Sequence, residues 1–295
     1  MDSVKNGHQS AVGRIDEYLA ALSTHVGKYE ISDYEGEIDE AVAESLEAFI
    51  PARDEYIRLL TAVARYNPDG RWIVRVHRFF ERLLPYISPR TNEKKGSGYD
   101  QDNFKFFIHE LFLYSIAVLL LFERFEQAGH LLSERYYTAQ GAIHGAMEKF
   151  DDFHKHLGSL EHRNERLKLG SEALRADLLK KRCVGTEVSF NSLMQADFTI
   201  FLRAELEYYP HYSHWWPELL MFLGMEGGSF EVYIRARSKA HFDRMRTVLG
   251  ITESEDLKDL IEAYKNESRR MPRGMKPRSM AQLVAYESLS TTETT

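Results

Sequence analysis

The sequence predicts a mostly α-helical fold, either a multi-helix bundle or an irregular array of helical hairpins. Apolar residues recur at every third or fourth position in most segments, which is the spacing of one helix face. Alternation typical of strands is confined to two short stretches, near residues 135–138 and 230–235. No period of about 34 or 40 residues repeats, so a regular solenoid is not predicted. We therefore expect helices throughout, with at most a small β element where those two stretches could pair.

The N-terminal half divides into helices at its turn residues. The apolar pattern of residues 13–26 predicts the first helix. Residues 39–67 predict two helices, because Pro51 interrupts a helix interior but is well tolerated in a first turn. Residues 71–87 predict a further helix that ends near Pro85.

The most apolar part of the chain is a twelve-residue run without charge from Leu111 to Phe122. A helix that spans a membrane needs about 20 apolar residues, so this run predicts a buried core helix instead. Asp102 or Asn103 is expected to cap that helix, because a short side-chain oxygen can accept a hydrogen bond from a free amide at a helix start.

The C-terminal half continues the helical pattern with one interruption. Phe230, Val232 and Ile234 alternate with more polar residues, which predicts a short strand over 230–235. The expected helices cover residues 159–169, 171–182, 189–209, 239–250 and 254–266.

Breaks in these patterns suggest three regions. Residues 1–137 form an N-terminal helical region, and residues 138–265 form a C-terminal helical region with the small β element. Residues 266–295 are basic at first and then low in complexity, so we expect a disordered tail there.

Composition excludes several classes of protein. The net charge is −7 and the isoelectric point about 6.0, which gives no global attraction to nucleic acid or to anionic lipid. The single cysteine, Cys183, excludes an internal disulfide, and the N-terminus shows no signal-peptide pattern. A cytoplasmic protein without a membrane partner is predicted.

Charge is nevertheless unevenly distributed along the chain. Residues 30–56 hold ten acidic residues against one basic residue, and residues 265–278 hold six basic residues against one acidic residue. These segments are either solvated surfaces or surfaces that meet a protein partner, a second copy of the chain or, for the basic segments, nucleic acid.

Most motifs of catalysis are absent from the sequence. His109 and Glu110 begin like a zinc-hydrolase motif, but Leu113 stands where the second histidine ligand is needed. No phosphate-binding loop, nucleotide-binding glycine motif or nucleophile elbow occurs. We therefore predict neither a metal nor a cofactor, and we expect Cys183 to be a small buried side chain.

One weak catalytic pattern remains, in Arg71 and His77. Their spacing resembles the arginine–histidine signature of HEPN-type ribonucleases, in which the histidine acts as general acid or base and the arginine stabilises charge on the scissile phosphate. Six positions along one helix separate two side chains by about 120°. Arg235 and His241 have the same spacing, which lowers the weight of the motif.

A second group of candidate residues favours binding rather than catalysis. Four central arginines could form a groove for an acidic or phosphate-bearing ligand such as a nucleotide, although helix-face ion pairs are the favoured explanation. Two tryptophans in an aromatic cluster could anchor an interface. The candidates are Arg163, Arg166, Arg175, Arg182, Trp215 and Trp216.

Four segments together resemble a helical module of prokaryotic anti-phage defence proteins over roughly residues 45–250. They are FIPARDEYIRLLTAVARY, DNFKFFIHELFLYSIAVLL, ALRADLLKKR and MQADFTIFLR. The resemblance implies sensing, regulation or scaffolding and carries over no catalytic residue. Our first prediction is thus a non-catalytic binding or regulatory protein of an antiviral defence system. The alternative is a metal-independent ribonuclease that uses Arg71 and His77.

Overall fold

The computed structural model describes residues 10–31, 34–67, 69–87, 99–138, 147–224, 228–266 and 277–292. Within these ranges the chain forms α-helices and short 3-10 helices and no strand, so the predicted fold class is confirmed. The α-helices are α2 (Ser10–Val26), α3 (Ile38–Ala48), α4 (Ile50–Tyr66), α5 (Ile73–Leu83), α6 (Asp102–Leu121), α7 (Phe125–Ser133), α9 (Gly158–Arg166), α10 (Leu174–Cys183), α11 (Phe190–Tyr208), α12 (Glu231–Arg235), α13 (Lys239–Leu249), α14 (Ser254–Asn266) and α15 (Pro277–Leu283). The 3-10 helices are η1 (Gly27–Tyr29), η2 (Gly70–Trp72), η3 (Leu84–Tyr86), η4 (Phe150–Phe153), η5 (Glu218–Phe222) and η6 (Tyr286–Ser288).

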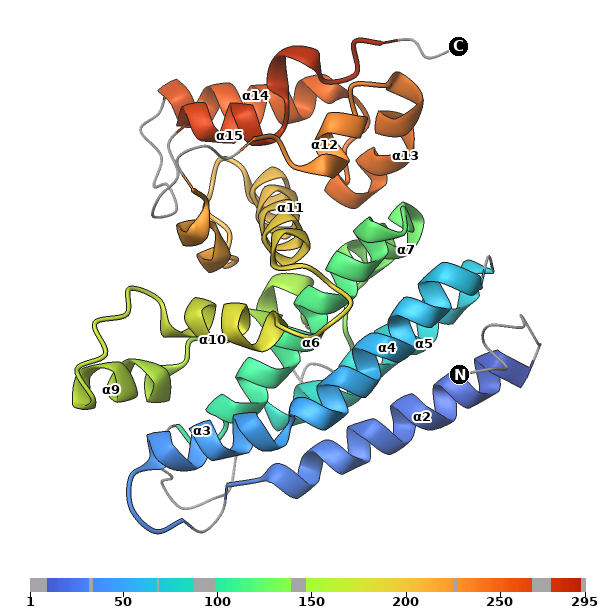
Figure 1. Ribbon diagram of the computed structural model, residues 1–295. Helices are drawn as coiled ribbons and strands as arrows, with labels where there is room; N and C mark the ends of the chain where they lie inside the picture. Colours follow the sequence, from blue (N-terminus) through green and yellow to red (C-terminus); the bar gives the residue numbers. More distant parts are fainter. Residues whose placement is uncertain are drawn as a thin grey trace.

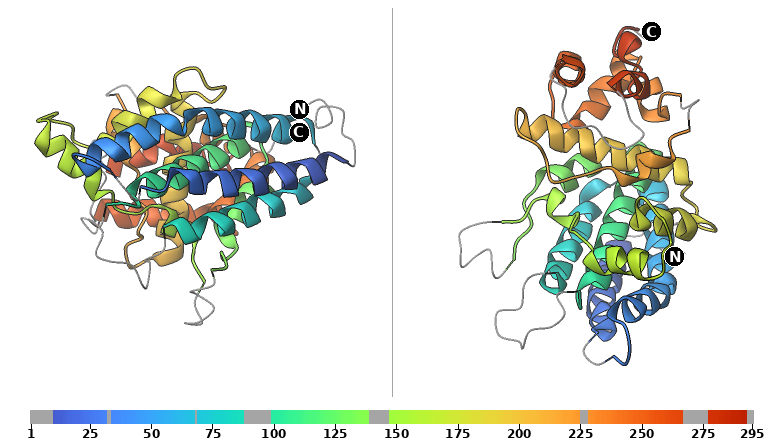
Figure 2. Two further views of the ribbon diagram at one scale, coloured as in Figure 1. Left: turned by 90° about the horizontal axis from the view of Figure 1, so that it is seen from below. Right: turned by 90° about the vertical axis from the view of Figure 1, so that its left-hand side faces the viewer.

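The helices are stacked in layers around α6 (Figure 1). Helices α2 to α5 form one side, where α2 packs on α5 and α4 packs on α6. Helix α11 crosses the opposite side of α6, and α12 to α15 lie beyond it. Helices α9 and α10 project to the side, and Figure 2 shows α2 and α15 at opposite ends of the molecule.

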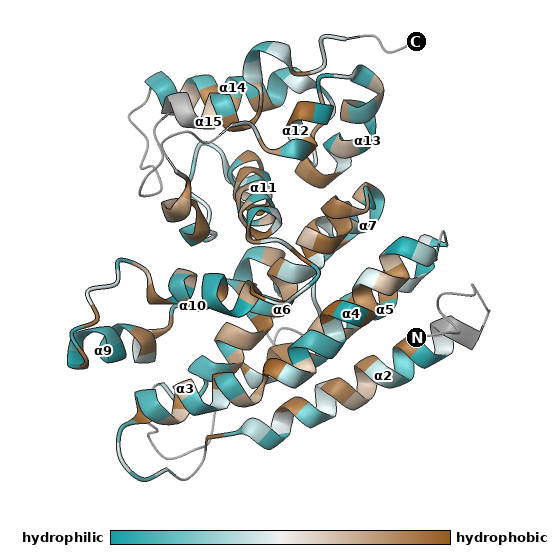
Figure 3. Ribbon diagram, in the orientation of Figure 1, coloured by the Kyte–Doolittle hydropathy of each residue, from teal (hydrophilic) through white to brown (hydrophobic). Residues whose placement is uncertain are grey.

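The charge-free run is the core helix that the sequence predicts. Every residue of α6 from Phe106 to Leu120 is buried, and its ribbon is mostly apolar in Figure 3. Although α6 is long and apolar enough to cross a membrane, 89% of its most apolar window is buried inside the fold. Such burial is what a core helix requires, and the absence of a membrane partner stays a prediction.

The start of α6 differs from the expected capping. Gln101 precedes the helix and no side chain caps it, so the prediction for Asp102 and Asn103 is wrong. The Asp102 carboxylate instead accepts a hydrogen bond from the backbone N–H of Ser159, at 2.8 Å. Asn103 donates to the backbone oxygen of Tyr29 and to Ser45. Both polar side chains are therefore used for tertiary contacts.

The expected strand over 230–235 is wrong, because α12 occupies it. Val232 and Tyr233 are both buried although they are adjacent, and Ile234 is 42% exposed. The backbone N–H of Val232, in the first turn of α12, donates to the buried side chain of Gln195 on α11. At residues 135–138 only Tyr136 pairs, through a single antiparallel bridge with Glu148.

The expected disordered tail is wrong for residues 277–292. Helix α15 packs on α14, and Leu283, Val284 and Leu289 are buried. Backbone bonds also join this segment to α12 and its flanks, for example from the Phe230 N–H to the Leu283 oxygen at 3.0 Å. Most of the basic stretch 265–278 lies outside the described residues.

Helices from both sides of the expected boundary at residue 138 pack against one another. Helix α11 lies along α6, and α13 lies along α7. The division into two helical regions stays a prediction, and these contacts show that the core is continuous across it.

Candidate functional site

Arg71 and His77 have separate surroundings. The Arg71 side chain is 88% exposed and pairs with Asp69, with its Nε 2.7 Å from a carboxylate oxygen. The His77 ring is mostly buried and stacks on Tyr136, with ring centres 4.3 Å apart. No described contact joins the two side chains, and the ribonuclease hypothesis gains no support from their placement.

Two of the central arginines attach α9 to α3. Arg166 lies 2.7 Å and Arg163 3.2 Å from the buried carboxylate of Asp39, and both also pair with Glu40. Burial alone would raise the pKa of Asp39, but the hydrogen bonds from both guanidinium groups outweigh it and hold that pKa below its usual value. These two arginines are therefore occupied within the fold.

The same place offers three groups that could hold a metal ion. Ligand atoms of Glu37, Asp39 and His162 all lie within 4.8 Å of one another. Arg163 and Arg166 already neutralise Asp39, and their positive charge opposes a bound cation. The arrangement is a helix-to-helix ion-pair cluster.

Arg182 is buried inside the molecule with Glu110 and Arg53. Its Nε and Nη2 each lie 2.8 Å from a carboxylate oxygen of Glu110, and its Nη1 donates to the Leu46 oxygen. Arg53 contacts the same carboxylate at 3.2 Å. Because all three side chains are buried, this predicted binding residue contacts only other parts of the chain.

Arg175 has the surroundings of a binding residue. Its side chain is 7% exposed, and its Nη2 donates to the Lys155 oxygen at 2.5 Å. Its Nε and Nη1 are buried and lack a hydrogen-bond partner, and the same holds for the Oε2 of Glu218. The Nε of Arg175 and the Oε2 of Glu218 form an ion pair 3.7 Å long. Arg175 and Glu218 line a cavity of about 140 Å³. We call it the Arg175 cavity, and its other lining residues are His156, Leu157, Leu160, Glu161, Asn164, Glu172, Ala173 and Leu174.

A second cavity of about 110 Å³ adjoins the first. The two share Glu172, Ala173 and Glu218 in their walls. Trp216, Pro217 and Met221 complete the wall of the second cavity. Two of the predicted binding residues thus line neighbouring cavities, Arg175 the first and Trp216 the second.

Buried aromatic rings lie behind the Arg175 cavity. Trp215, His109 and His154 contact one another with ring centres 5.0 to 5.3 Å apart. Burial, followed by the positive charge of Arg175, lowers the pKa of both histidines well below the usual value. The His154 Nε2 lies 3.9 Å from Glu218, and the His109 Nδ1 is buried without a hydrogen-bond partner.

Asp197 fixes the position of Trp215. Its carboxylate accepts hydrogen bonds from the Trp215 indole N–H at 2.8 Å and from the Leu219 backbone N–H at 3.0 Å. Burial outweighs these bonds and raises the pKa of Asp197 to about 7. Trp215 is 1% exposed, so it supports the wall from behind and does not face solvent as an interface anchor would.

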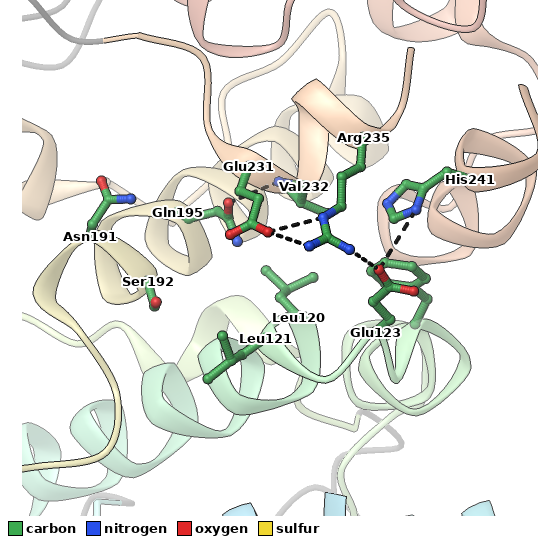
Figure 4. Close-up of a pocket in the computed structure, with 11 residues that line it drawn as sticks. Leu120, Leu121, Glu123, Asn191, Ser192, Gln195, Glu231, Val232, Arg235 and His241 are labelled. Atoms are coloured by element: carbon green, nitrogen blue, oxygen red, sulfur yellow. Dashed lines mark hydrogen bonds and ion pairs between the residues drawn. The ribbon is translucent and has the colours of Figure 1, made fainter. Parts of the chain in front are cut away.

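A further pocket of about 60 Å³ holds the second arginine–histidine pair (Figure 4). The Arg235 guanidinium lies between Glu231 and Glu123, 2.8 Å from the latter, and the His241 Nδ1 lies 4.0 Å from the same Glu123 carboxylate. Arg244 also pairs with Glu123. The acidic and basic groups neutralise one another, so this pocket is an ion-pair network that joins the end of α6 to α12 and α13.

Sequence reasoning missed one residue in the wall of the Arg175 cavity and two residues behind it. Glu218, His154 and Asp197 come from three separate segments, and no spacing within the chain relates them. Only the packing of η5 against α10 and α11 brings them together. His154 and His156 stand two residues apart in the sequence, but nothing there relates them to the aromatic and acidic side chains that surround His154.

No protein-family model, no curated protein and no solved structure matches this chain.

Proposed function

We propose that this chain is a non-catalytic binding protein with a regulatory or sensing role, and that it binds a small polar ligand in the Arg175 cavity. The observation that carries the proposal is a cavity lined by buried charged atoms without hydrogen-bond partners. Buried polar groups are nearly always satisfied by protein, water or ligand, because an unsatisfied group costs about 1–3 kcal/mol. The Nε and Nη1 of Arg175 and the Oε2 of Glu218 are such groups, and all three belong to residues that line one cavity.

The surrounding residues support binding rather than catalysis. Glu218 and Arg175 already lie beside one another, and the two histidines behind them are buried with low pKa values. Concave sites with a few convergent polar groups among apolar side chains are typical of small-molecule binding. A ligand here would contact α9, α10 and η5 together and so change how tightly the projecting helices are held.

The wider role that fits this proposal is sensing in a prokaryotic antiviral defence system, as the sequence resemblance implies. A protein partner or a second copy of the chain would then read the ligand-bound state. Phage challenge of cells that carry the gene with its neighbours tests this role, with Arg175→Gln as the comparison. Equal plating of phage with and without the gene would contradict it.

Blocking the cavity tests the proposed binding directly. Ala173 lines both cavities, so Ala173→Phe fills the space with a ring, whereas Ala240→Phe adds the same ring at an exposed position of α13. A library of polar metabolites is screened by thermal shift on the full-length protein. A ligand at 100 times its Kd stabilises the folded state by about 2.7 kcal/mol. We expect stabilisation of the wild type and of Ala240→Phe but not of Ala173→Phe; equal shifts in all three would contradict the site.

A further inference from the structure

We propose that the Arg175 cavity recognises a zwitterion of the α-amino acid class, by its carboxylate and its ammonium group together. This inference rests on the proposed function and names the ligand of the same site. It is carried by a 3.7 Å ion pair in one cavity wall, between the Nε of Arg175 and the Oε2 of Glu218, whose two atoms, like the Nη1 of Arg175, are buried without a hydrogen-bond partner.

Arg175 is suited to the carboxylate end. Its Nε and Nη1 lack an acceptor, and a charged guanidinium N–H forms a strong hydrogen bond with a carboxylate oxygen. The third nitrogen, Nη2, donates to the Lys155 backbone oxygen, so the guanidinium group is already oriented before a ligand binds. Arg175 lies in the first turn of α10, where backbone N–H groups without a helical acceptor also favour negative charge.

The adjoining cavity is suited to the ammonium end. The Glu218 Oε2 lacks a hydrogen-bond donor, and Glu172 and Trp216 line the same cavity. Carboxylates and an indole ring together attract an ammonium group, by charge and by the negative face of the ring.

The charge of the walls argues against other ligand classes. The two cavities are lined by three carboxylates, of Glu161, Glu172 and Glu218, against the single guanidinium of Arg175. A phosphate dianion would be repelled by this excess, which makes the nucleotide expected from the central arginines a poor fit. A ligand with only positive charge would meet the buried Arg175. A ligand with one negative and one positive charge can pair with both Arg175 and the carboxylates.

The apolar residues in the wall and the volumes of the cavities further limit the choice of ligand. Leu157, Leu160 and Leu174 can contact an aliphatic side chain. Each cavity is smaller than the roughly 300 Å³ at which pockets for drug-sized ligands begin. We therefore choose L-leucine as the probe, because two compounds share its side chain and lack one charged end each.

The decisive measurement compares these three compounds by titration calorimetry with the full-length wild type. The compounds are L-leucine, 4-methylpentanoate, which lacks the ammonium group, and 3-methylbutylamine, which lacks the carboxylate. Loss of a hydrogen-bonded charge weakens binding by about tenfold or more. We expect leucine to bind and each one-ended analogue to bind at least about tenfold more weakly.

Two variants test which residue contacts the carboxylate of leucine and which contacts its ammonium group. Arg175→Gln should reduce the affinity for leucine to about that for 3-methylbutylamine, and Glu218→Gln should reduce it to about that for 4-methylpentanoate. Lys181→Gln, an exposed position on the same helix as Arg175, is the matched control and should bind like the wild type. The indole N–H signal of Trp216 in NMR spectra, assigned with Trp216→Phe, should shift on addition of leucine.

The outcomes separate this inference from the proposed function. If an analogue with one charge binds as tightly as leucine, or if another compound shifts the Trp216 signal and leucine does not, the amino-acid assignment is wrong and the binding function stands. If no compound of the metabolite library stabilises the protein or shifts that signal, both are wrong. The wild-type comparison needs no variant, so a substitution that unfolds the chain leaves the test intact.

Discussion

Glu110 is a buried charge that links three helices of the core. Its side chain is fully buried in α6, where both oxygens accept hydrogen bonds from Arg182 and one also contacts Arg53. These contacts link α4 and α10 to the central helix. Bringing charges out of water is costly, so the carboxylate is tolerated only because two guanidinium groups compensate it.

We predict that Glu110→Gln destabilises the protein by about 3–5 kcal/mol, because it leaves the buried Arg182 without a counter-charge and leaves Arg53 with Asp54 alone. The measurement is the free energy of unfolding from urea titration. Glu187→Gln is the control, since its ion pair with Arg65 is 3.6 Å long and about half exposed on both sides. That change should cost less than about 1 kcal/mol. Similar losses for the two variants would contradict the structural role of Glu110.

His154 makes stability depend on pH. Burial lowers its pKa well below the usual 6.5 in the folded protein, whereas the unfolded chain takes up a proton near pH 6.5. Acidification therefore favours the unfolded state. Between about pH 7.5 and about pH 5.5 this one group removes about 1.4 kcal/mol of stability.

His154→Phe keeps a ring against Trp215 and removes the titration. We expect the wild type to lose about 1.4 kcal/mol more than this variant over that pH interval, measured by urea titration at each pH. Asp197 acts in the opposite direction, because its pKa of about 7 means that stability falls as pH rises from 3.8 to 7. It is present in both proteins, so it cancels from the comparison. Parallel pH profiles would contradict the assignment.

At the level of elements, the close approach of α7 and α13 depends on one glycine. A side-chain carbon added at Gly129 would lie 2.9 Å from the backbone oxygen of Thr247. Backbone cannot move aside as a flexible side chain can, so contact there forces the two helices apart. Gly129 is therefore required by packing and not by backbone conformation.

We predict that Gly129→Ala destabilises the protein by about 1–3 kcal/mol, even though alanine is the better helix former. Gly13→Ala is the matched control in α2, where an added carbon would meet nothing within 4 Å. That substitution should stabilise the protein by about 0.5–1 kcal/mol. The comparison is made by thermal or urea unfolding, and a gain in stability at both positions would show that α7 and α13 are not in close contact.

Some elements could be predicted from the sequence, whereas α12 could not. The boundary between α3 and α4 next to Pro51 and the extent of the core helix followed from local chemistry. The short α12 did not, because alternation over six residues describes a strand and a docked helical turn equally well. Its conformation depends on Gln195 of another helix, which accepts the Val232 N–H.

On the scale of the whole molecule, α6 is surrounded by helices from both halves of the chain. It packs on α3, α4 and α5 from the first half and on α11 from the second. A single core of this kind unfolds as a unit.

We predict one cooperative unfolding transition in urea. In Trp72→Phe the fluorescence of Trp215 and Trp216 reports on this part of the second half and on the contact of Trp215 with His109 of α6, while far-UV circular dichroism reports on all helices. The two curves should coincide within error, as two-state unfolding requires. A second transition, or a fluorescence midpoint apart from the helical one, would instead support two regions that fold separately.

Local sequence was enough to predict the helical class, the central core helix and the helix boundary at Pro51, because apolar periodicity and turn residues act over a few neighbouring positions. It also identified Arg175 and Trp216 as candidates from their residue types. Only the packing of the helices shows that Arg163, Arg166 and Arg182 form ion pairs inside the fold. Arg175, by contrast, keeps N–H groups without a hydrogen-bond acceptor beside a cavity. The reason is that the role of a charged side chain depends on its partners, and these partners lie between 20 and 136 positions away along the chain.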